Sequence, residues 1–173
     1  MTTHFISSEN TETMSLDELA NQFKMIQSGE KRIAIIGTRN LPIIHQQIIE
    51  TLSYALAQAR NTIVTSGGIS GVNSAVIRGA MKADPNLLEV ILPQTLNEQN
   101  AEIHSLLKNL KILIEHPERL SMDFVEASRI CYNEIVSSAH QVISFVYHDS
   151  RTILQAVEYA KLSKKIVTEF FLD

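Results

Sequence analysis

Three turns in this sequence carry the residues best suited to hold an anion. The first comprises Gly37, Thr38, Arg39 and Asn40 and follows an apolar run. The second is richer in glycine and serine and reads Ser66, Gly67, Gly68, Ile69, Ser70, Gly71, Val72, Asn73, Ser74. Glycine lets a backbone approach a phosphate closely, and a helix after the turn offers unpaired N–H groups and the positive end of its dipole. Both turns therefore indicate phosphate binding, with a plain turn as the alternative for each.

The third turn repeats the pattern at residues 148–152. Its serine, arginine and threonine stand at the start of a helical segment, where they can bind an anion. The alternative is that Asp149 or Ser150 is an ordinary helix cap. If the third turn faces the first in space, the two together would hold a phosphate or a nucleotide.

Several other chemistries are not indicated. The first turn has one glycine and so lacks the G-x-G-x-x-G fingerprint of dinucleotide-binding proteins, and the second lacks the Gly-Lys-Ser/Thr ending of a Walker loop. The six histidines are scattered and Cys131 is the single cysteine, so no metal site is expected. We assign no catalytic residue and no cofactor.

Strands and helices must alternate to position these turns. Apolar runs predict strands at 32–36, 62–65, 88–92, 111–114, 141–147 and 165–170. Helical spacing predicts helices at 42–59, 70–82, 121–139 and 151–162, with a partly helical segment at 93–109. Ser121 or Asp123 is expected to cap the helix at 121–139. Such alternation is typical of parallel strands joined by helical crossovers. We therefore expect an α/β fold: a doubly wound, mostly parallel Rossmann-like sheet with helices on both faces, and a ligand at the carboxyl ends of its strands.

Length and composition fit one domain. The chain has 173 residues, 45% of them hydrophobic, which is enough for a full core. Residues 1–30 are expected to form a flexible tail plus a short helix, because Ser15 and Glu18 make a capping box that starts a helix through Met25. Residues 31–173 are expected to form the single Rossmann-like domain.

Charge and hydropathy narrow the function classes. The net charge of −4 excludes a generally basic, histone-like grip on nucleic acid, although a local basic patch is compatible with it. No apolar run approaches the roughly 18 residues of a spanning helix, so no membrane partner is expected. A single cysteine is most simply explained by a reducing cytoplasm.

The first two turns resemble a known family. The runs I-A-I-I-G-T-R-N and I-V-T-S-G-G-I-S-G-V-N-S-A-V-I-R-G-A resemble the Rossmann-like core of DprA/Smf, the DNA-processing or recombination-mediator family. That core belongs to a superfamily with the LOG (lysine-decarboxylase-like) proteins. The resemblance covers about residues 31–171 and implies a homodimer that binds single-stranded DNA phosphate. It implies phosphate-binding roles for Gly37, Arg39, Ser66, Gly67, Gly68 and Gly71.

The chain departs from the family pattern at a few positions. The family usually has Gly-Ile-Asp where this chain has Gly71-Val72-Asn73, and a histidine where Ile77 stands. Its Arg-Asn-Arg run is matched only at Asn133, and its Ser-Gly-Ser segment corresponds to residues 150–152. These departures remove basic residues and favour a ligand other than DNA as an alternative.

Three functions follow from these observations. The residues favour a binding protein for single-stranded DNA or a nucleotide, with a role in DNA processing implied by the resemblance. One alternative is a LOG-like nucleotide phosphoribohydrolase, but its Pro-Gly-Gly-x-Gly-Thr-x-x-Glu signature is missing and no motif places the carboxylate of Glu134 or Glu158. The other alternative is a small-nucleotide sensor or carrier. The expected ligand-binding residues are Gly37, Thr38, Arg39, Ser66, Gly67, Gly68, Ser70, Gly71, Asn73, Asn133, Ser150, Arg151 and Thr152.

Overall fold

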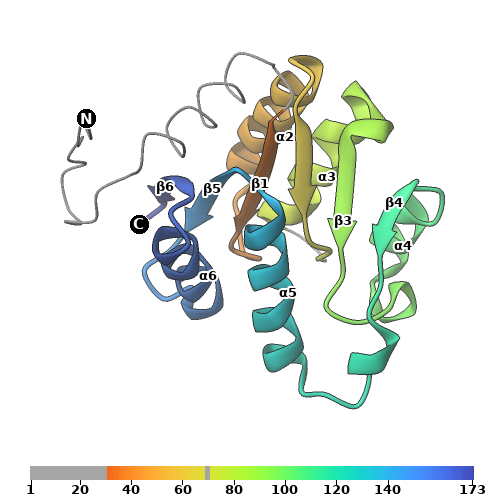
Figure 1. The fold of residues 1–173 in the computed structure, drawn as a ribbon. Coiled ribbons are helices and arrows are strands. Elements are labelled where there is room, and N and C mark those ends of the chain that lie inside the picture. Colours follow the sequence, from red (N-terminus) through yellow and green to blue (C-terminus); the bar gives the residue numbers. More distant parts are fainter. Residues whose placement is uncertain (1–30, 69–70) are drawn as a thin grey trace, which may run out of the picture.

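Six parallel strands form one sheet in the computed structural model, which describes residues 31–68 and 71–173 (Figure 1). Their order is β4-β3-β2-β1-β5-β6, and every neighbouring pair is parallel. The expected doubly wound α/β fold is thereby confirmed, with a fully parallel sheet. The strands are β1 (Arg32–Gly37), β2 (Thr62–Thr65), β3 (Leu88–Ile91), β4 (Ile112–Ile114), β5 (Gln141–Val146) and β6 (Ile166–Phe171).

The helices begin and end close to the predicted positions. They are α2 (Ile43–Gln58), α3 (Val72–Ala83), α4 (Ala101–Leu107), α5 (Phe124–Ser138) and α6 (Arg151–Leu162), with single turns η1 (Pro85–Leu87), η2 (Leu96–Glu98) and η3 (Pro117–Arg119). The start of α5 differs from the prediction by three residues. Of the two expected caps, Ser121 and Asp123, the structure has Asp123: its side chain accepts hydrogen bonds from the N–H groups of Val125 and Glu126, so the helix starts after it. The expected N-terminal tail and helix lie outside the described residues.

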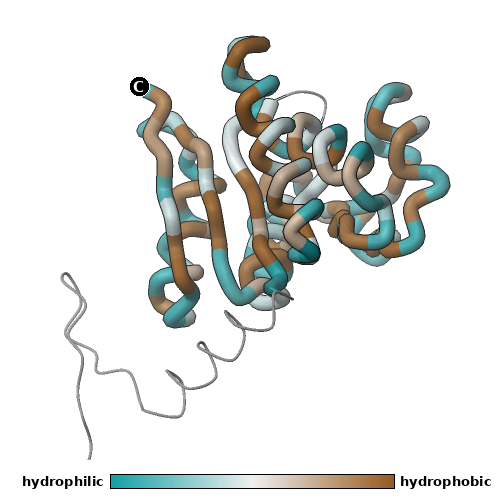
Figure 2. Tube along the Cα trace, turned by 90° about the horizontal axis from the view of Figure 1, so that it is seen from above, coloured by the Kyte–Doolittle hydropathy of each residue, from teal (hydrophilic) through white to brown (hydrophobic). Residues whose placement is uncertain are grey.

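The two faces of the sheet bury separate sets of apolar side chains. On β1, Ile33 and Ile35 pack with residues of α2, α3 and α4, whereas Ala34 and Ile36 pack with residues of α5 and α6. This alternation follows from the two-residue period of a strand, and burial of apolar surface on both faces drives the packing. Figure 2 shows the hydrophobic stretches along the strands and hydrophilic residues in many of the connecting turns.

The chain changes direction across the sheet between β1 and β5. From β1 it proceeds outward through β2, β3 and β4, and then returns to β5 and β6 on the other side. The ends of β1 and β5 remain paired, because the Thr38 N–H donates to the Phe145 carbonyl at 3.0 Å. Beyond this point the turns after β1 and β5 separate, which is where open α/β sheets bind ligands. None of the helices in the described part of the chain is long and apolar enough to cross a membrane.

Candidate ligand-binding site

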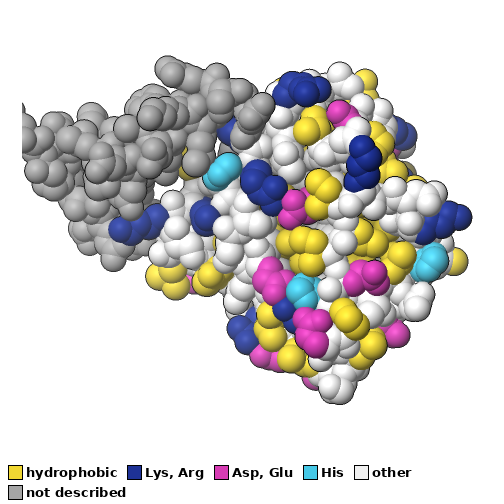
Figure 3. Space-filling model, turned by 45° about the vertical axis from the view of Figure 1, so that its right-hand side comes forward, with side chains coloured by type: hydrophobic (Ala, Val, Ile, Leu, Met, Phe, Trp, Pro, Cys, Tyr) yellow, Lys and Arg dark blue, Asp and Glu magenta, His cyan; other side chains and the backbone are white. Residues whose placement is uncertain are grey.

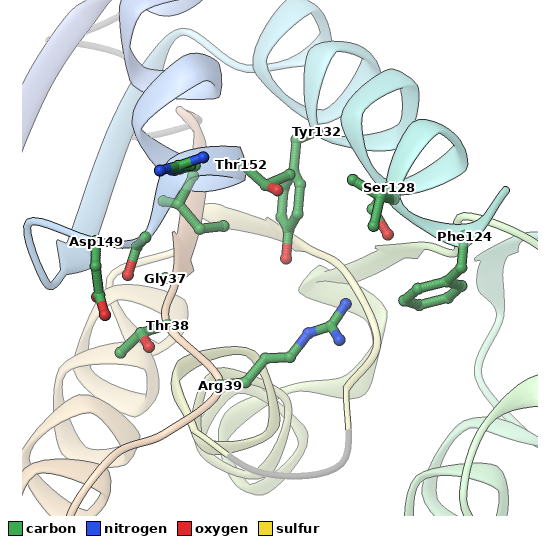
Figure 4. Close-up of a pocket in the computed structure, with 12 residues that line it drawn as sticks. Gly37, Thr38, Arg39, Phe124, Ser128, Tyr132, Asp149 and Thr152 are labelled. Carbon is green, nitrogen blue, oxygen red and sulfur yellow. The ribbon is translucent and has the colours of Figure 1, made fainter.

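Two adjoining cavities lie at the carboxyl ends of the strands. The first cavity, of about 290 Å³, lies between the turn after β1, the turn after β5 and helix α5 (Figure 4). The second cavity, of about 160 Å³, lies between the turn after β2, the η2–α4 segment and α5. Four residues line both cavities, namely Arg39, Phe124, Ser128 and Tyr132. The two cavities are therefore parts of one site.

Nine of the thirteen expected residues line this site. The first cavity takes Gly37, Thr38, Arg39, Ser150, Arg151 and Thr152. The second takes Ser66, Gly67 and Gly68 and shares Arg39. The fold thus brings all three turns together, as the position of the switch point requires.

The start of α6 is open toward the first cavity. Its N-cap residue Ser150 makes no side-chain cap, because the Ser150 Oγ accepts a hydrogen bond from the Tyr147 N–H at 3.3 Å instead. The positive end of the helix dipole is therefore not covered by a serine oxygen, and Arg151 and Thr152 lie beside it. This end of the cavity suits an anion.

Gly71 joins the second turn to the first and does not line either cavity. Its φ is +88°, a conformation that glycine adopts readily, and a Cβ there would overlap the carbonyl oxygens of Thr38 and Arg39. The N–H of Val72 also donates to the Thr38 carbonyl at 3.0 Å. Gly71 therefore fixes the position of Arg39 through backbone packing.

Asn73 lines neither cavity, but its side chain contacts two residues that line the second cavity. Its side chain is buried, and its Nδ2 donates to the Gly67 carbonyl at 3.1 Å and to the Tyr132 Oη at 3.0 Å. Its Oδ1 is buried without a hydrogen-bond partner among the described residues. Asn73 thus ties the glycine turn to α5 and positions Tyr132.

Tyr132 and Ser128 present two hydroxyl groups to the site. Burial raises the pKa of Tyr132, and the hydrogen bond from Asn73 offsets part of that rise, so the phenol is neutral at pH 7 and can donate. Ser128 is 5% exposed, and its Oγ has no hydrogen-bond partner in the described part of the chain. Because a buried hydroxyl without a partner is costly, the Ser128 Oγ is ready to bind a polar ligand atom.

Phe124 and Ser128 also line the site, although no sequence motif marks them. Together with Tyr132 they recur at spacings of four along α5, which places them on one face of the helix. The Phe124 ring is 40% exposed and lies 5.1 Å from the Arg39 guanidinium carbon, in cation–π contact. Their spacing was a usable signal, but it does not show which face of α5 meets the turns.

The remaining expected residues lie elsewhere. Asn133 lines a groove between α5 and α6 that also contains Ser137 and Tyr159, and it lines neither cavity. Ser70 lies outside the described residues. The next residue along the helix, Glu134, borders the same groove, where it is bound by Arg119 and lies 3.0 Å from the His116 Nε2.

The carboxylates considered for catalysis are not in the site. Glu134 is engaged by Arg119 and His116, and Glu158 lines neither cavity. Below the second cavity, burial raises the pKa of Cys131 to about 12, and its thiol donates to the Ile91 carbonyl at 3.1 Å. A protonated, buried thiol is neither a nucleophile nor a metal ligand. Among residues 31–68 and 71–173, no cluster of three His, Cys, Asp or Glu side chains could hold a metal ion.

The surface charge is mixed. On the face shown in Figure 3, Lys and Arg side chains lie among Asp, Glu and His side chains. Arg39 and Arg151 are the two arginines that line the first cavity.

Comparison with known proteins identifies a family. The family model described as DNA recombination-mediator protein A matches residues 22–148, well over half of the chain. No curated protein sequence matches the chain.

Two solved structures share the fold. DNA processing protein A from Helicobacter pylori, described with a single-stranded DNA binding mode, superposes with a TM-score of 0.60 at 19% identity. That match covers 80% of this chain and 64% of the other, so this chain spans less than two thirds of the H. pylori chain. The molybdenum cofactor carrier protein of Chlamydomonas reinhardtii gives a TM-score of 0.59 at 19% identity, over 81% of this chain and 76% of that one.

Proposed function

Because this chain belongs to the DNA recombination-mediator protein A family, we propose that it binds a phosphate-bearing ligand, single-stranded DNA or a nucleotide, at the carboxyl ends of its strands. In this proposal the phosphate occupies the first cavity. The DNA version carries with it a role in DNA processing or recombination, in keeping with the family and with the DNA-binding relative from H. pylori.

One observation carries the proposal: three separate turns converge on one site that is rich in donors. The uncapped start of α6 and the arginines at 39 and 151 border the first cavity. So does the Ser128 Oγ, which has no hydrogen-bond partner among the described residues. Arginine and helix N-termini are the groups that proteins use to bind phosphate. Gly37 lets the end of β1 pack closely against β5, because a Cβ at this position would overlap the Phe145 carbonyl.

Fluorescence anisotropy of a labelled oligo-dT tests this function. We expect binding that weakens as salt rises, because each neutralised phosphate releases counterions, and that falls at least several-fold in Arg39→Ala. Arg129→Ala is the matched control, since Arg129 pairs with Glu126 on α5 and lines neither cavity.

The outcomes separate the two ligands. Salt-dependent binding that Arg39→Ala weakens and Arg129→Ala leaves unchanged supports the DNA version. No oligo-dT binding at low salt rejects the DNA version, and titration with mononucleotides then tests the nucleotide version. Failure of both oligo-dT and mononucleotides to bind rejects the proposal.

A small-ligand carrier is the second candidate. The small volume of the second cavity and its position beside the first favour a compact ligand, and the structurally similar Chlamydomonas protein is named a molybdenum cofactor carrier. We expect no turnover of nucleotides by the two carboxylates considered for the phosphoribohydrolase reaction, because Glu134 is bound by Arg119 and Glu158 lines neither cavity.

We further propose that the protein forms a homodimer, as the family resemblance implies. We also propose that it is located in the cytoplasm, because a single cysteine fits a reducing compartment. Sedimentation velocity over a tenfold range of protein concentration tests the dimer. A monomer mass of 19.4 kDa throughout that range would reject it.

A further inference from the structure

The second cavity differs from the first in the chemistry of its wall. The first offers arginines, hydroxyls and a helix N-terminus, which suit an anion, with Asp149 as the carboxylate on its lining. The second has Glu98, Gln99 and Asn100 from the η2–α4 segment, and the Phe124 ring from α5. A carboxylate only accepts hydrogen bonds, and a carboxamide both accepts and donates. Apart from Arg39, which lines both cavities, this wall suits a planar ring that carries N–H donors.

The polar groups of this wall have hydrogen-bonding capacity to spare. Within the described part of the chain, neither the Glu98 carboxylate nor the Gln99 carboxamide makes a side-chain hydrogen bond. The Gln99 carboxamide lies against Gly67, where a Cβ would overlap its Oε1. Glycine at position 67 therefore leaves room for this carboxamide at the cavity wall.

The wall shared by the two cavities supplies a stacking surface. The Phe124 ring is 40% exposed and borders both cavities, and aromatic side chains of this kind stack on nucleic-acid bases. Ser128, 5% exposed and without a partner for its Oγ among the described residues, lines the same wall (Figure 4). A ligand that crosses from one cavity to the other would satisfy this hydroxyl.

We infer that the second cavity holds the base of a nucleotide whose phosphate occupies the first, and that Glu98 makes it select a base with two adjacent N–H donors, as guanine has. The inference rests on the proposed function, since it requires the phosphate in the first cavity. The Glu98 carboxylate accepts from the guanine N1–H and 2-amino groups. Adenine presents an unprotonated N1 at that edge, so two acceptors would face each other and its binding would be weaker.

Isothermal titration calorimetry with GMP, IMP and AMP tests this selection. We expect GMP to bind about tenfold more tightly than AMP, the scale of one hydrogen bond to a charged group, and IMP, which lacks the 2-amino group, to fall between them. Glu98→Gln should remove the preference for GMP, because the carboxamide NH2 can donate to the adenine N1 and strengthens AMP binding. Glu102→Gln is the matched control, because Glu102 is an exposed carboxylate on α4 that lines neither cavity. Both positions are exposed, so both variants should fold.

The possible results distinguish the inference from the proposed function. Equal affinity for GMP and AMP, or a GMP preference that survives in Glu98→Gln, overturns the inference and leaves phosphate binding intact. Failure of all three nucleotides and of oligo-dT to bind overturns the proposed function. A labelled oligo-dT with one central dG, compared with oligo-dT alone, identifies the source of the base. A preference for the dG strand indicates guanine within a strand, whereas a preference seen with GMP alone indicates a free nucleotide.

Discussion

Arg39 and Phe124 meet across the site, with the guanidinium carbon of Arg39 lying 5.1 Å from the centre of the Phe124 ring. Arg39 lies in the turn after β1 and Phe124 is the first residue of α5, so the contact joins this turn to the helix. Both residues line both cavities. It places a cation, which can bind a phosphate, next to a ring, which can stack on a base.

Replacing the ring should weaken the binding of base-containing ligands. We expect Phe124→Ala to lower nucleotide or oligonucleotide affinity by about 5- to 150-fold, because base–aromatic stacking contributes about 1–3 kcal/mol per base. Anisotropy titration measures the loss. Leu120→Ala is the control, since Leu120 is also exposed but lines neither cavity. Equal affinity in wild type and Phe124→Ala would show that no base stacks there.

Removing the Ser128 hydroxyl should weaken binding without weakening the fold. Its Oγ is buried and has no partner in the described residues, so Ser128→Ala should leave the free energy of unfolding unchanged within about 0.5 kcal/mol, or raise it. Ser53→Ala is the contrasting variant, because the buried Ser53 Oγ donates a hydrogen bond to the Val76 carbonyl at 2.8 Å. Loss of this bond should lower the free energy of unfolding by about 1 kcal/mol. Urea unfolding compares the two, and a Ser128→Ala loss as large as that of Ser53→Ala would contradict this assignment.

A methyl group at position 71 should damage both the fold and the site. Gly71→Ala forces a side chain into a positive φ and onto the Thr38 and Arg39 carbonyls, so we expect a loss of about 2 kcal/mol or more in the free energy of unfolding. Because Arg39 must shift, phosphate-ligand affinity should fall as well. Gly79→Ala overlaps the Glu50 carbonyl away from the site, and should lower stability while the folded protein keeps its affinity. Unchanged affinity in folded Gly71→Ala would contradict the packing role.

The stability contribution of His140 should depend on pH. Burial, followed by the charges of Lys165 and Arg32, lowers the pKa of His140, and its Nδ1 accepts a hydrogen bond from the Arg32 N–H at 3.0 Å. The native state therefore favours the neutral ring, and the unfolded chain takes up the proton at a higher pH than the folded one. This contribution is complete above the ordinary histidine pKa of about 6.5 and is lost as pH falls through the lower native value.

The comparison of wild type with His140→Asn measures this effect. Between pH 8 and pH 5 the wild-type free energy of unfolding should fall more than that of the variant, which has no titrating ring at this position. His104→Gln, on α4, serves as the control for loss of a histidine away from this contact. A parallel fall in wild type and His140→Asn would contradict the prediction.

Much of the scaffold was predictable from local patterns. The bounds of β2 and α6 were predicted to the residue, because an apolar β-branched run and a helical period are strong local signals. The convergence of the turns at 37–39 and 150–152 followed from a topological rule and not from a local pattern.

The rest of the site depends on tertiary packing. Tyr132 faces the cavities whereas Asn133 borders the groove beside α6, because neighbouring residues on a helix point about 100° apart. The rotation of α5 about its own axis is set by its packing on α6, β1 and β3, which no local spacing encodes. Residues 98–100 could not be predicted to line the site either, because the polar segment at 93–109 has no clear periodicity that would indicate which of its residues face inward.

The shared wall also makes the site observable by spectroscopy. The chain contains no tryptophan, so Phe124→Trp would introduce a single indole, which can be excited apart from the tyrosines, between the two cavities. Indole keeps an aromatic face for the Arg39 guanidinium, and tryptophan is the strongest partner for such a cation. Its emission would report the arrival of an unlabelled ligand in either cavity, so one optical signal could follow anions, free bases and whole nucleotides in the same protein.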